Sequence, residues 1–172
     1  HSDFIVLDGA PGITRESLAT LKVSKEVIVI TNPEMASVTD ALKTVKLCKD
    51  YNKDVLGVLV TKTNAKNADM SLKAIEEILE VPIIGIIPED RAVKFAIANK
   101  EAVVHHYPTS AAAIQYKKLA ADLLNVKYSE RIEASGNGFF DGVLKWLGFK
   151  DWMFKYIVTL KGARRPKIDR KE

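Results

Sequence analysis

The sequence contains very little cysteine. Cys48 is the only one among 172 residues, so no disulfide can form within the chain and no metal site can be built from several of its thiolates. It falls in the apolar pattern of a predicted helix, beside Val45 and Leu47. We therefore interpret Cys48 as core packing rather than as a reactive thiol. Such low cysteine usage is typical of a reducing compartment.

The sequence also lacks a phosphate-binding loop of the form G-x-x-x-x-G-K-[ST]. No other segment combines glycines with a lysine in the way that cradles the phosphates of a nucleotide. A basic segment followed by an apolar one, as in a secretory leader, is missing at the start as well. Because His1 stands almost directly before an apolar run, we expect a further N-terminal portion in the intact protein.

Basic residues are not in excess over most of the chain, although the net charge is +4. Residues 1–138 carry 17 Lys and Arg against 18 Asp and Glu, a balance of −1. Residues 139–172 carry nine against four, a balance of +5. The body therefore has no basic surplus of the kind that binds phosphate backbones, and we expect no nucleic-acid partner.

What the sequence does contain is a regular alternation of strand-like and helix-like segments. Apolar, β-rich runs stand at 4–7, 27–31, 55–60 and 83–87. Amphipathic segments fall near 14–22, 37–50, 68–80, 91–98 and 109–124. Continuous apolar strands separated by helices predict an α/β fold, a parallel sheet flanked by helices on both faces.

Asp8 directly follows the run 4–7, and a Gly-Ala-Pro-Gly turn comes next. An Asp at the carboxyl end of a parallel strand can hold the water shell of Mg²⁺, and a glycine such as Gly12 lets a backbone N–H approach a phosphate. An ordinary turn after a strand is the alternative. Three later strand ends also carry polar or turn residues, at 31–34, 61–62 and 88–90. We therefore predict a ligand site along that edge.

The order and spacing of these segments resemble one family. The matching segments read DFIVLDGAPG, VIVITNPEMASVTDALK, VLGVLVTKTN and VPIIGIIPEDRAVKFAIANKEAVV. Residues 2–125 resemble the C-terminal two-thirds of a MinD-type ATPase, from the MinD/ParA branch of deviant-Walker P-loop proteins, with an archaeal character. The resemblance implies an incomplete P-loop NTPase fold over residues 1–132, with ATP and Mg²⁺ as cofactors of the intact protein.

The resemblance also assigns roles to residues. Asp8 matches the Walker B aspartate, which acts on Mg²⁺ through water. Gly12 matches the glycine that senses the γ-phosphate, with Pro11 shaping the turn. Thr61 and Lys62 stand where the family usually has an Asn-Arg pair that reads the adenine edge and packs on the ring. This replacement leaves the choice of base open, because Thr lacks an amide and Lys lacks a planar guanidinium.

The segment after the last strand matches the loop that closes over the base in the family. Its matching residues are Pro88, Glu89, Asp90 and Val93. The family's phosphate-binding loop and its water-positioning segment have no match in the chain. The resemblance therefore implies no catalytic residue in this fragment, and we expect the chain alone not to hydrolyse ATP.

A Gly-rich linker at 133–138 separates the body from a C-terminal tail at 139–172. Between 139 and 160 the tail is apolar but carries five charged residues and two glycines, Gly142 and Gly148, and a basic segment follows. This pattern favours an amphipathic helix on a membrane surface over a spanning helix. The alternative is a helical hairpin packed on the body. The residues that we expect to meet lipid are Phe139, Phe140, Val143, Leu144, Trp146, Leu147, Phe149, Trp152, Phe154, Lys161, Arg164 and Arg165.

Together these features predict a cytoplasmic protein that associates peripherally with the inner face of the cytoplasmic membrane through anionic lipids. The resemblance implies an ATP-dependent homodimer that positions division or cell-surface machinery, with an activator or cargo protein that the sequence does not identify. A non-catalytic, membrane-docked scaffold of the same fold is the alternative. A related iron–sulfur carrier is disfavoured, because the Cys-x-x-Cys pair expected there is absent.

Overall fold

The computed structural model describes residues 4–64 and 69–128. Helices and strands alternate along most of this body, as the sequence pattern predicts. The elements are α1 (Arg15–Val23), β1 (Glu26–Thr31), α2 (Met35–Asp50), β2 (Asp54–Thr63), α3 (Leu72–Leu79), β3 (Ile83–Pro88), α4 (Arg91–Ala98), α5 (Val103–His106) and α6 (Ala111–Leu124). The short helix α5 is the one element in the described body that the sequence pattern did not indicate.

The three described strands form one parallel sheet in the order β1-β2-β3. Their carboxyl ends are level, because Thr31 of β1 is paired with Val60 of β2, and Val60 is paired with Ile86 of β3. Helices connect the consecutive strands, which a parallel arrangement requires. The predicted α/β class is confirmed.

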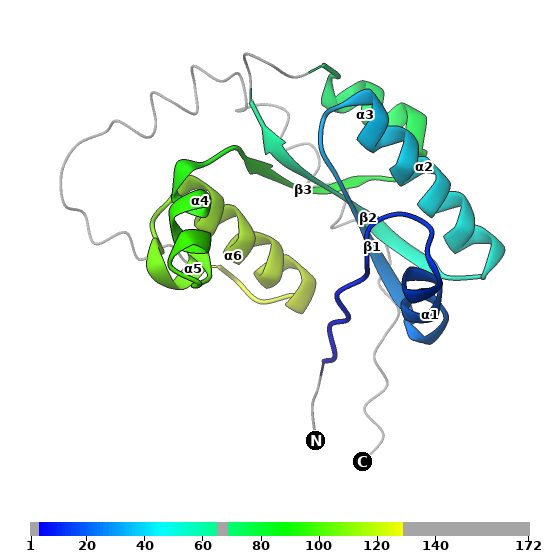
Figure 1. Ribbon diagram of the computed structural model, residues 1–172, viewed down its shortest axis with the longest axis horizontal. Helices are drawn as coiled ribbons and strands as arrows, with labels where there is room; N and C mark the ends of the chain where they lie inside the picture. Colours follow the sequence, from blue (N-terminus) through cyan, green and yellow to red (C-terminus); the bar gives the residue numbers. More distant parts are fainter. Residues whose placement is uncertain (1–3, 65–68, 129–172) are drawn as a thin grey trace. The chain divides into compact units, whose positions relative to one another are not determined.

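The core lies on both faces of this sheet. Helices α2 and α3 cover one face, where Val38, Val45, Ile75 and Leu79 are fully buried against strand residues. Helix α6 covers β2 and β3 on the other face, and Figure 1 shows these two groups of helices on opposite sides of the strands. Burying a large aliphatic side chain contributes about 1.5–3 kcal/mol, so this double layer holds the carboxyl ends of the strands in fixed positions.

Hydroxyl side chains begin three of the helices. Thr14, Ser71 and Ser110 each accept a hydrogen bond from the backbone N–H three residues later. Such a cap satisfies one of the N–H groups that a helix leaves unpaired at its start, and it is worth about 1 kcal/mol. Two helices, α3 and α6, end at left-handed residues, Glu80 and Asn125.

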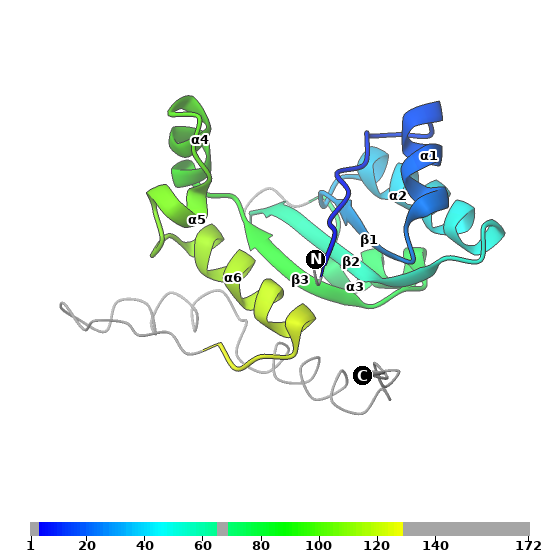
Figure 2. The ribbon, with the colours of Figure 1, turned by 90° about the horizontal axis from the view of Figure 1, so that it is seen from below.

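The predicted strand at 4–7 is wrong in this structure. These residues form no ladder with the described sheet and are exposed, with Val6 92% accessible to solvent. Figure 2 shows the N-terminal segment as an irregular chain. The apolar run predicts burial, but a strand also needs a neighbour for its backbone groups, and no described strand lies beside it.

The predicted linker at 133–138 and the tail at 139–172 lie outside the described residues, as does the end of the predicted domain 1–132. In the part of the chain that the structure describes, no helix has the length and apolar character needed to cross a bilayer.

Candidate functional site at the carboxyl edge of the sheet

The sheet brings three strand ends to one edge. Asn32 follows β1 directly, Thr61 lies one residue beyond the level of the paired Val60, and Pro88 ends β3. Because parallel strands run in the same direction, their carboxyl ends meet at this edge, which is where open α/β sheets bind ligands. The edge is therefore the candidate site.

A β-bulge lies at this edge. Val60 is paired with Ile86 and Thr63 with Pro88, so Thr61 and Lys62 together oppose a single residue of β3. Lys62 has a φ of 55°, a left-handed conformation that is unfavourable for a residue with a side chain. Bulges of this kind change the direction of side chains and occur beside functional sites. The irregularity falls on the two residues that the family resemblance places against the base.

The Thr61 side chain contacts the end of the neighbouring strand. Its hydroxyl group donates a hydrogen bond to the Oδ1 atom of Asn32, at 2.9 Å, and lies 3.3 Å from the carbonyl oxygen of Thr31. Thr61 and Asn32 are both partly buried. Thr61 thus connects β2 to the segment after β1 and positions the Asn32 carboxamide at the sheet edge.

Hydrogen bonds also hold the backbone at Asn32. Its carbonyl oxygen accepts hydrogen bonds from the N–H of Glu34, at 2.8 Å, and from the hydroxyl of Thr31, at 3.2 Å. Pro33 follows and is buried, and a proline restricts the preceding residue to extended conformations. The backbone of Asn32 therefore has little conformational freedom.

Asp90 begins α4 and contacts a second helix. One carboxylate oxygen accepts from the N–H of Ala92 at 2.8 Å, and the other accepts from the N–H of Ala112 in α6 at 3.0 Å. The carboxylate thus joins the N-termini of two helices, where the helix dipole favours a negative charge. Asp90 shapes the loop after β3 through these bonds.

Glu89 directly precedes Asp90 and is exposed. Its carboxylate accepts a hydrogen bond from Asn64 at 3.3 Å and pairs with Lys94 at 3.5 Å. The hydrogen bond from Asn64, followed by the hydrogen bond and charge of Lys94, lowers the pKa of Glu89 below its ordinary value, and the charge of Lys62 adds to this. Glu89 therefore presents a negative charge at the edge near neutral pH, and its backbone N–H also donates to the carbonyl of Thr63 at 2.9 Å.

Pro88 and Val93 flank these two carboxylates. Pro88 is partly buried at the end of β3. Val93 packs against the clusters beneath α4 and α6, so part of its side chain anchors the loop. Among the predicted base-side residues, the structure thus brings together Thr61, Lys62 and the loop 88–93.

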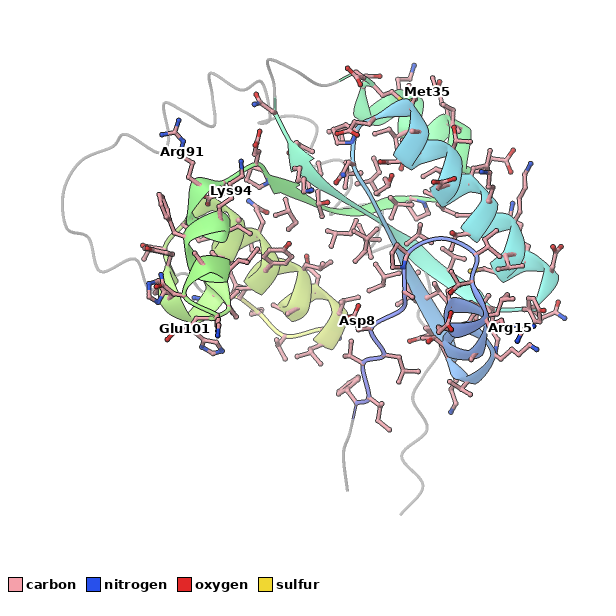
Figure 3. The ribbon with its side chains drawn as sticks, in the orientation of Figure 1. Asp8, Arg15, Met35, Arg91, Lys94 and Glu101 are labelled. Atoms are coloured by element: carbon pink, nitrogen blue, oxygen red, sulfur yellow. The ribbon has the colours of Figure 1, made fainter. Side chains whose placement is uncertain are left out.

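Asp8, Pro11 and Gly12 are not brought to this edge. All three are exposed and lie in the irregular segment before α1. In Figure 3 the labelled Asp8 is separate from Met35 and Arg91, which begin the helices after β1 and β3. The cause is the missing pairing of residues 4–7, which leaves nothing to hold Asp8 level with the other strand ends.

Gly12 and Asp8 still suit the roles that the sequence predicts for them, at a phosphate and at Mg²⁺. Gly12 has a φ of 74°, which favours glycine, and among the described residues no atom beyond its chain neighbours lies within 4 Å of the place where a Cβ would stand. The exposed Asp8 carboxylate can hold Mg²⁺ through water if phosphate oxygens supply further ligands. Within residues 4–64 and 69–128, no group of three or more His, Cys, Asp or Glu side chains is placed to hold a metal by itself.

Sequence reasoning missed Asn32 as a site residue. The Asn-Pro dipeptide after an apolar strand was a usable signal, because it predicts a fixed, extended residue at the strand end. The bulge at Thr61 and Lys62 had no such signal, since it depends on how β2 pairs with β3.

Comparison with known proteins identifies the family. Residues 1–124 match the ParA model, described as an NUBPL iron-transfer P-loop NTPase. The chain belongs to the ParA family of P-loop NTPases. An ATP-binding protein of Methanocaldococcus jannaschii is 34% identical over 145 residues, covering 84% of this chain and 55% of that protein. The septum site-determining protein MinD of Neisseria meningitidis is 32% identical over 150 residues, covering 80% of this chain and 55% of that protein.

Solved MinD structures share the ParA-family fold described here. The cell division ATPase MinD of Pyrococcus furiosus has a TM-score of 0.67 at 28% identity, covering 72% of this chain and 52% of that one. MinD from Pyrococcus horikoshii, solved as a complex with Mg-ADP, has a TM-score of 0.66 at 26% identity, covering 70% of this chain and 50% of that one. The chain thus spans about half the length of the relatives it matches.

Proposed function

We propose that this chain is the C-terminal part of a MinD-like ATPase, and that it supplies the base-binding side of a nucleotide site. In the intact protein, Mg²⁺ and ATP bind at the carboxyl edge of the sheet. ATP binding drives homodimerisation, and the dimer attaches to the cytoplasmic membrane through its tails. Hydrolysis reverses the attachment, which gives a switch that positions division or cell-surface machinery.

The observation that carries this proposal is the arrangement of the strand ends in a chain of the ParA family. Asn32, Thr61 and the loop 88–93 meet at one edge and are held there by hydrogen bonds between elements. This edge is the ligand-binding position of open parallel sheets. A relative of similar fold was solved with Mg-ADP, which supports a nucleotide as the ligand.

Exposed apolar residues support the proposal that a further segment completes the site. Helix α6 covers one face of the sheet over β2 and β3. On the same face, Ile30 of β1 is 63% exposed. Phe4, Ile5 and Val6 are more than 60% exposed. A parallel sheet is stable when helices cover both of its faces, and these residues are therefore expected to be covered in the intact protein. We expect the segment that covers these residues to bring Asp8 to the edge and to supply the phosphate-binding loop.

The proposed membrane attachment rests on the composition of residues 139–172. Their balance of +5 attracts anionic headgroups at about 1 kcal/mol per cation near the surface. One short amphipathic segment binds lipid weakly, whereas two segments joined in a dimer gain through effective concentration. Dimerisation is thus a physical means by which a nucleotide can control attachment.

Co-sedimentation of the intact protein with anionic vesicles tests this proposal. We expect binding with Mg-ATP, weaker binding with Mg-ADP, and no binding by a variant that ends at Gly138. Raised salt should weaken binding, because the attraction is partly electrostatic. Equal binding with ATP and ADP would contradict the switch, and binding that survives removal of the tail would contradict its role.

A scaffold without catalysis is the second candidate. It is favoured by Thr61 and Lys62, which replace the Asn-Arg pair of the family pattern. Phosphate release by the intact protein distinguishes the two candidates. Hydrolysis that depends on Mg²⁺ supports the ATPase, whereas nucleotide-independent vesicle binding without hydrolysis supports the scaffold.

Iron transfer, which the description of the family model names, receives no support from this chain. Its single cysteine, Cys48, is fully buried against the core. A buried thiol, whose pKa is raised by burial, is a poor ligand for an exchangeable cluster.

A further inference from the structure

We propose that Asn32, held by Thr61, is the group that contacts the purine base, and that it gives the site little preference for adenine over guanine. This inference rests on the proposed function, because it needs a nucleotide at the carboxyl edge. The inference adds to the proposed function a specificity-determining residue, Asn32. It also names the class of ligand, purine nucleotides with either an amino or an oxo group at position 6.

Asn32 lies beside Thr61 at the end of the neighbouring strand. Its Oδ1 atom lies 2.9 Å from the hydroxyl of Thr61, the residue that the family resemblance places against the base. The Asn32 carboxamide therefore stands one hydrogen bond away from the location where the family pattern has the amide of an asparagine on β2. An amide from the neighbouring strand end thus lies directly beside the Thr61 side chain.

The hydrogen bond from Thr61 orients the Asn32 amide. Thr61 donates to Oδ1 and so directs this oxygen toward its own hydroxyl, while the Nδ2 group of the Asn32 carboxamide faces the other way. Among the described residues Nδ2 makes no hydrogen bond and is not a buried unpaired atom, so it is open to a ligand. The backbone of Asn32 is fixed by Glu34, Thr31 and Pro33, so the amide is preorganised with its Nδ2 donor turned away from Thr61.

Adenine and guanine differ in the group that they present at position 6. A free amide reads adenine by donating to N7 and accepting from the 6-amino group, whereas a group that only donates suits N7 and the 6-oxo group of guanine. N7 is common to both purines. Lys62, whose left-handed backbone lies next in the bulge, adds a second donor without an acceptor. A donor-only edge therefore gives no advantage to adenine.

Equilibrium titration of the intact protein with Mg-ATP and Mg-GTP tests this inference. We expect the two dissociation constants of the wild-type protein to agree within about tenfold, since one good base contact is worth about that factor. Asn32→Asp replaces the donor by an acceptor of the same shape. It should weaken GTP at least about tenfold more than ATP, because a carboxylate accepts from the 6-amino group and repels the 6-oxo group.

Thr61→Val is the matched second variant, because it removes the hydroxyl and keeps the shape of the side chain. It frees the Asn32 amide to turn, so the ATP to GTP preference should move toward adenine while thermal stability changes little. Thr39→Val is the control, since its exposed hydroxyl bonds only within α2. It should leave the ratio unchanged.

The outcomes separate the two proposals. If both nucleotides bind and the ratio is the same in wild type and Asn32→Asp, the inference is wrong while the proposed function stands. A strong wild-type preference for ATP would also overturn it. If neither nucleotide binds the wild-type protein, the proposed function fails.

Discussion

The carboxylate of Asp90 joins the N-termini of α4 and α6. It accepts from Ala92 at 2.8 Å and from Ala112 at 3.0 Å, across 22 residues of sequence. The family resemblance assigns Asp90 to the loop that closes over a base. The structure adds that this side chain also fixes the position of the loop, because both of its oxygens are used to bond backbone N–H groups.

Replacement of Asp90 should therefore destabilise the fold. Asp90→Ala removes a helix cap and a second charge-assisted hydrogen bond, and we expect a loss of about 2 kcal/mol in the free energy of unfolding. Urea denaturation of the full chain measures this. Glu89→Gln is the control, since that exposed carboxylate has only surface partners and its replacement should change little. Equal stability of Asp90→Ala and wild type would contradict the role given to Asp90.

Gly57 is a position where only glycine fits. Its φ is 152°, and a Cβ there would stand 2.6 Å from the carbonyl oxygen of Pro82 and would overlap Ile84. Gly57→Ala should cost about 3 kcal/mol through overpacking and backbone strain. Gly85→Ala is the comparison, because its new methyl group meets the ends of the flexible Leu59 and Leu119 side chains. We expect a loss of about 1 kcal/mol there. Thermal or urea unfolding measures both, and the reverse order of effects would contradict the packing described.

Cys48 should be unreactive in the folded protein. It has no accessible surface, and burial raises the pKa of its thiol above the ordinary value of 9.0. Thiolate formation therefore favours the unfolded chain, so this group contributes stability that is lost as the pH rises past 9.0 toward the folded value. Labelling with a thiol reagent at neutral pH should be slow and become complete in denaturant. Rapid labelling without denaturant would show that the helix α2 does not pack as described.

The chain on its own should not hydrolyse ATP. Positioning of the phosphates and neutralisation of their charge supply most of the rate enhancement in phosphoryl transfer, and this chain has no phosphate-binding loop. A phosphate-release assay with the purified chain should give the rate of the buffer alone. Magnesium-dependent release above that rate would contradict the assignment of the catalytic groups to another part of the protein.

The sequence predicted β1, β2 and β3 to within a few residues, because each is a continuous apolar run between helical segments and is buried by helices. It failed at residues 4–7, where the same signal was present but no described strand lies beside them. Hydrophobicity specifies burial and local conformation, whereas strand formation also depends on a partner.

The site was predicted only in part for a related reason. Strand order brings Thr61 and the loop 88–93 together, and this follows from the α/β pattern. The bond between Asn32 and Thr61 depends on the register of β1 with β2 and on the bulge between β2 and β3. Neither is encoded by a local motif, so tertiary pairing decided which polar group stands at the edge.

The most direct test of the nucleotide site is photo-crosslinking of the intact protein with an azido derivative of ATP, followed by mapping of the labelled peptides. The account predicts labelling within 31–34, 61–64 or 88–93 that excess unlabelled nucleotide removes. Competable labelling elsewhere in the chain, or no competable labelling at all, would contradict the claim that this sheet edge holds the base.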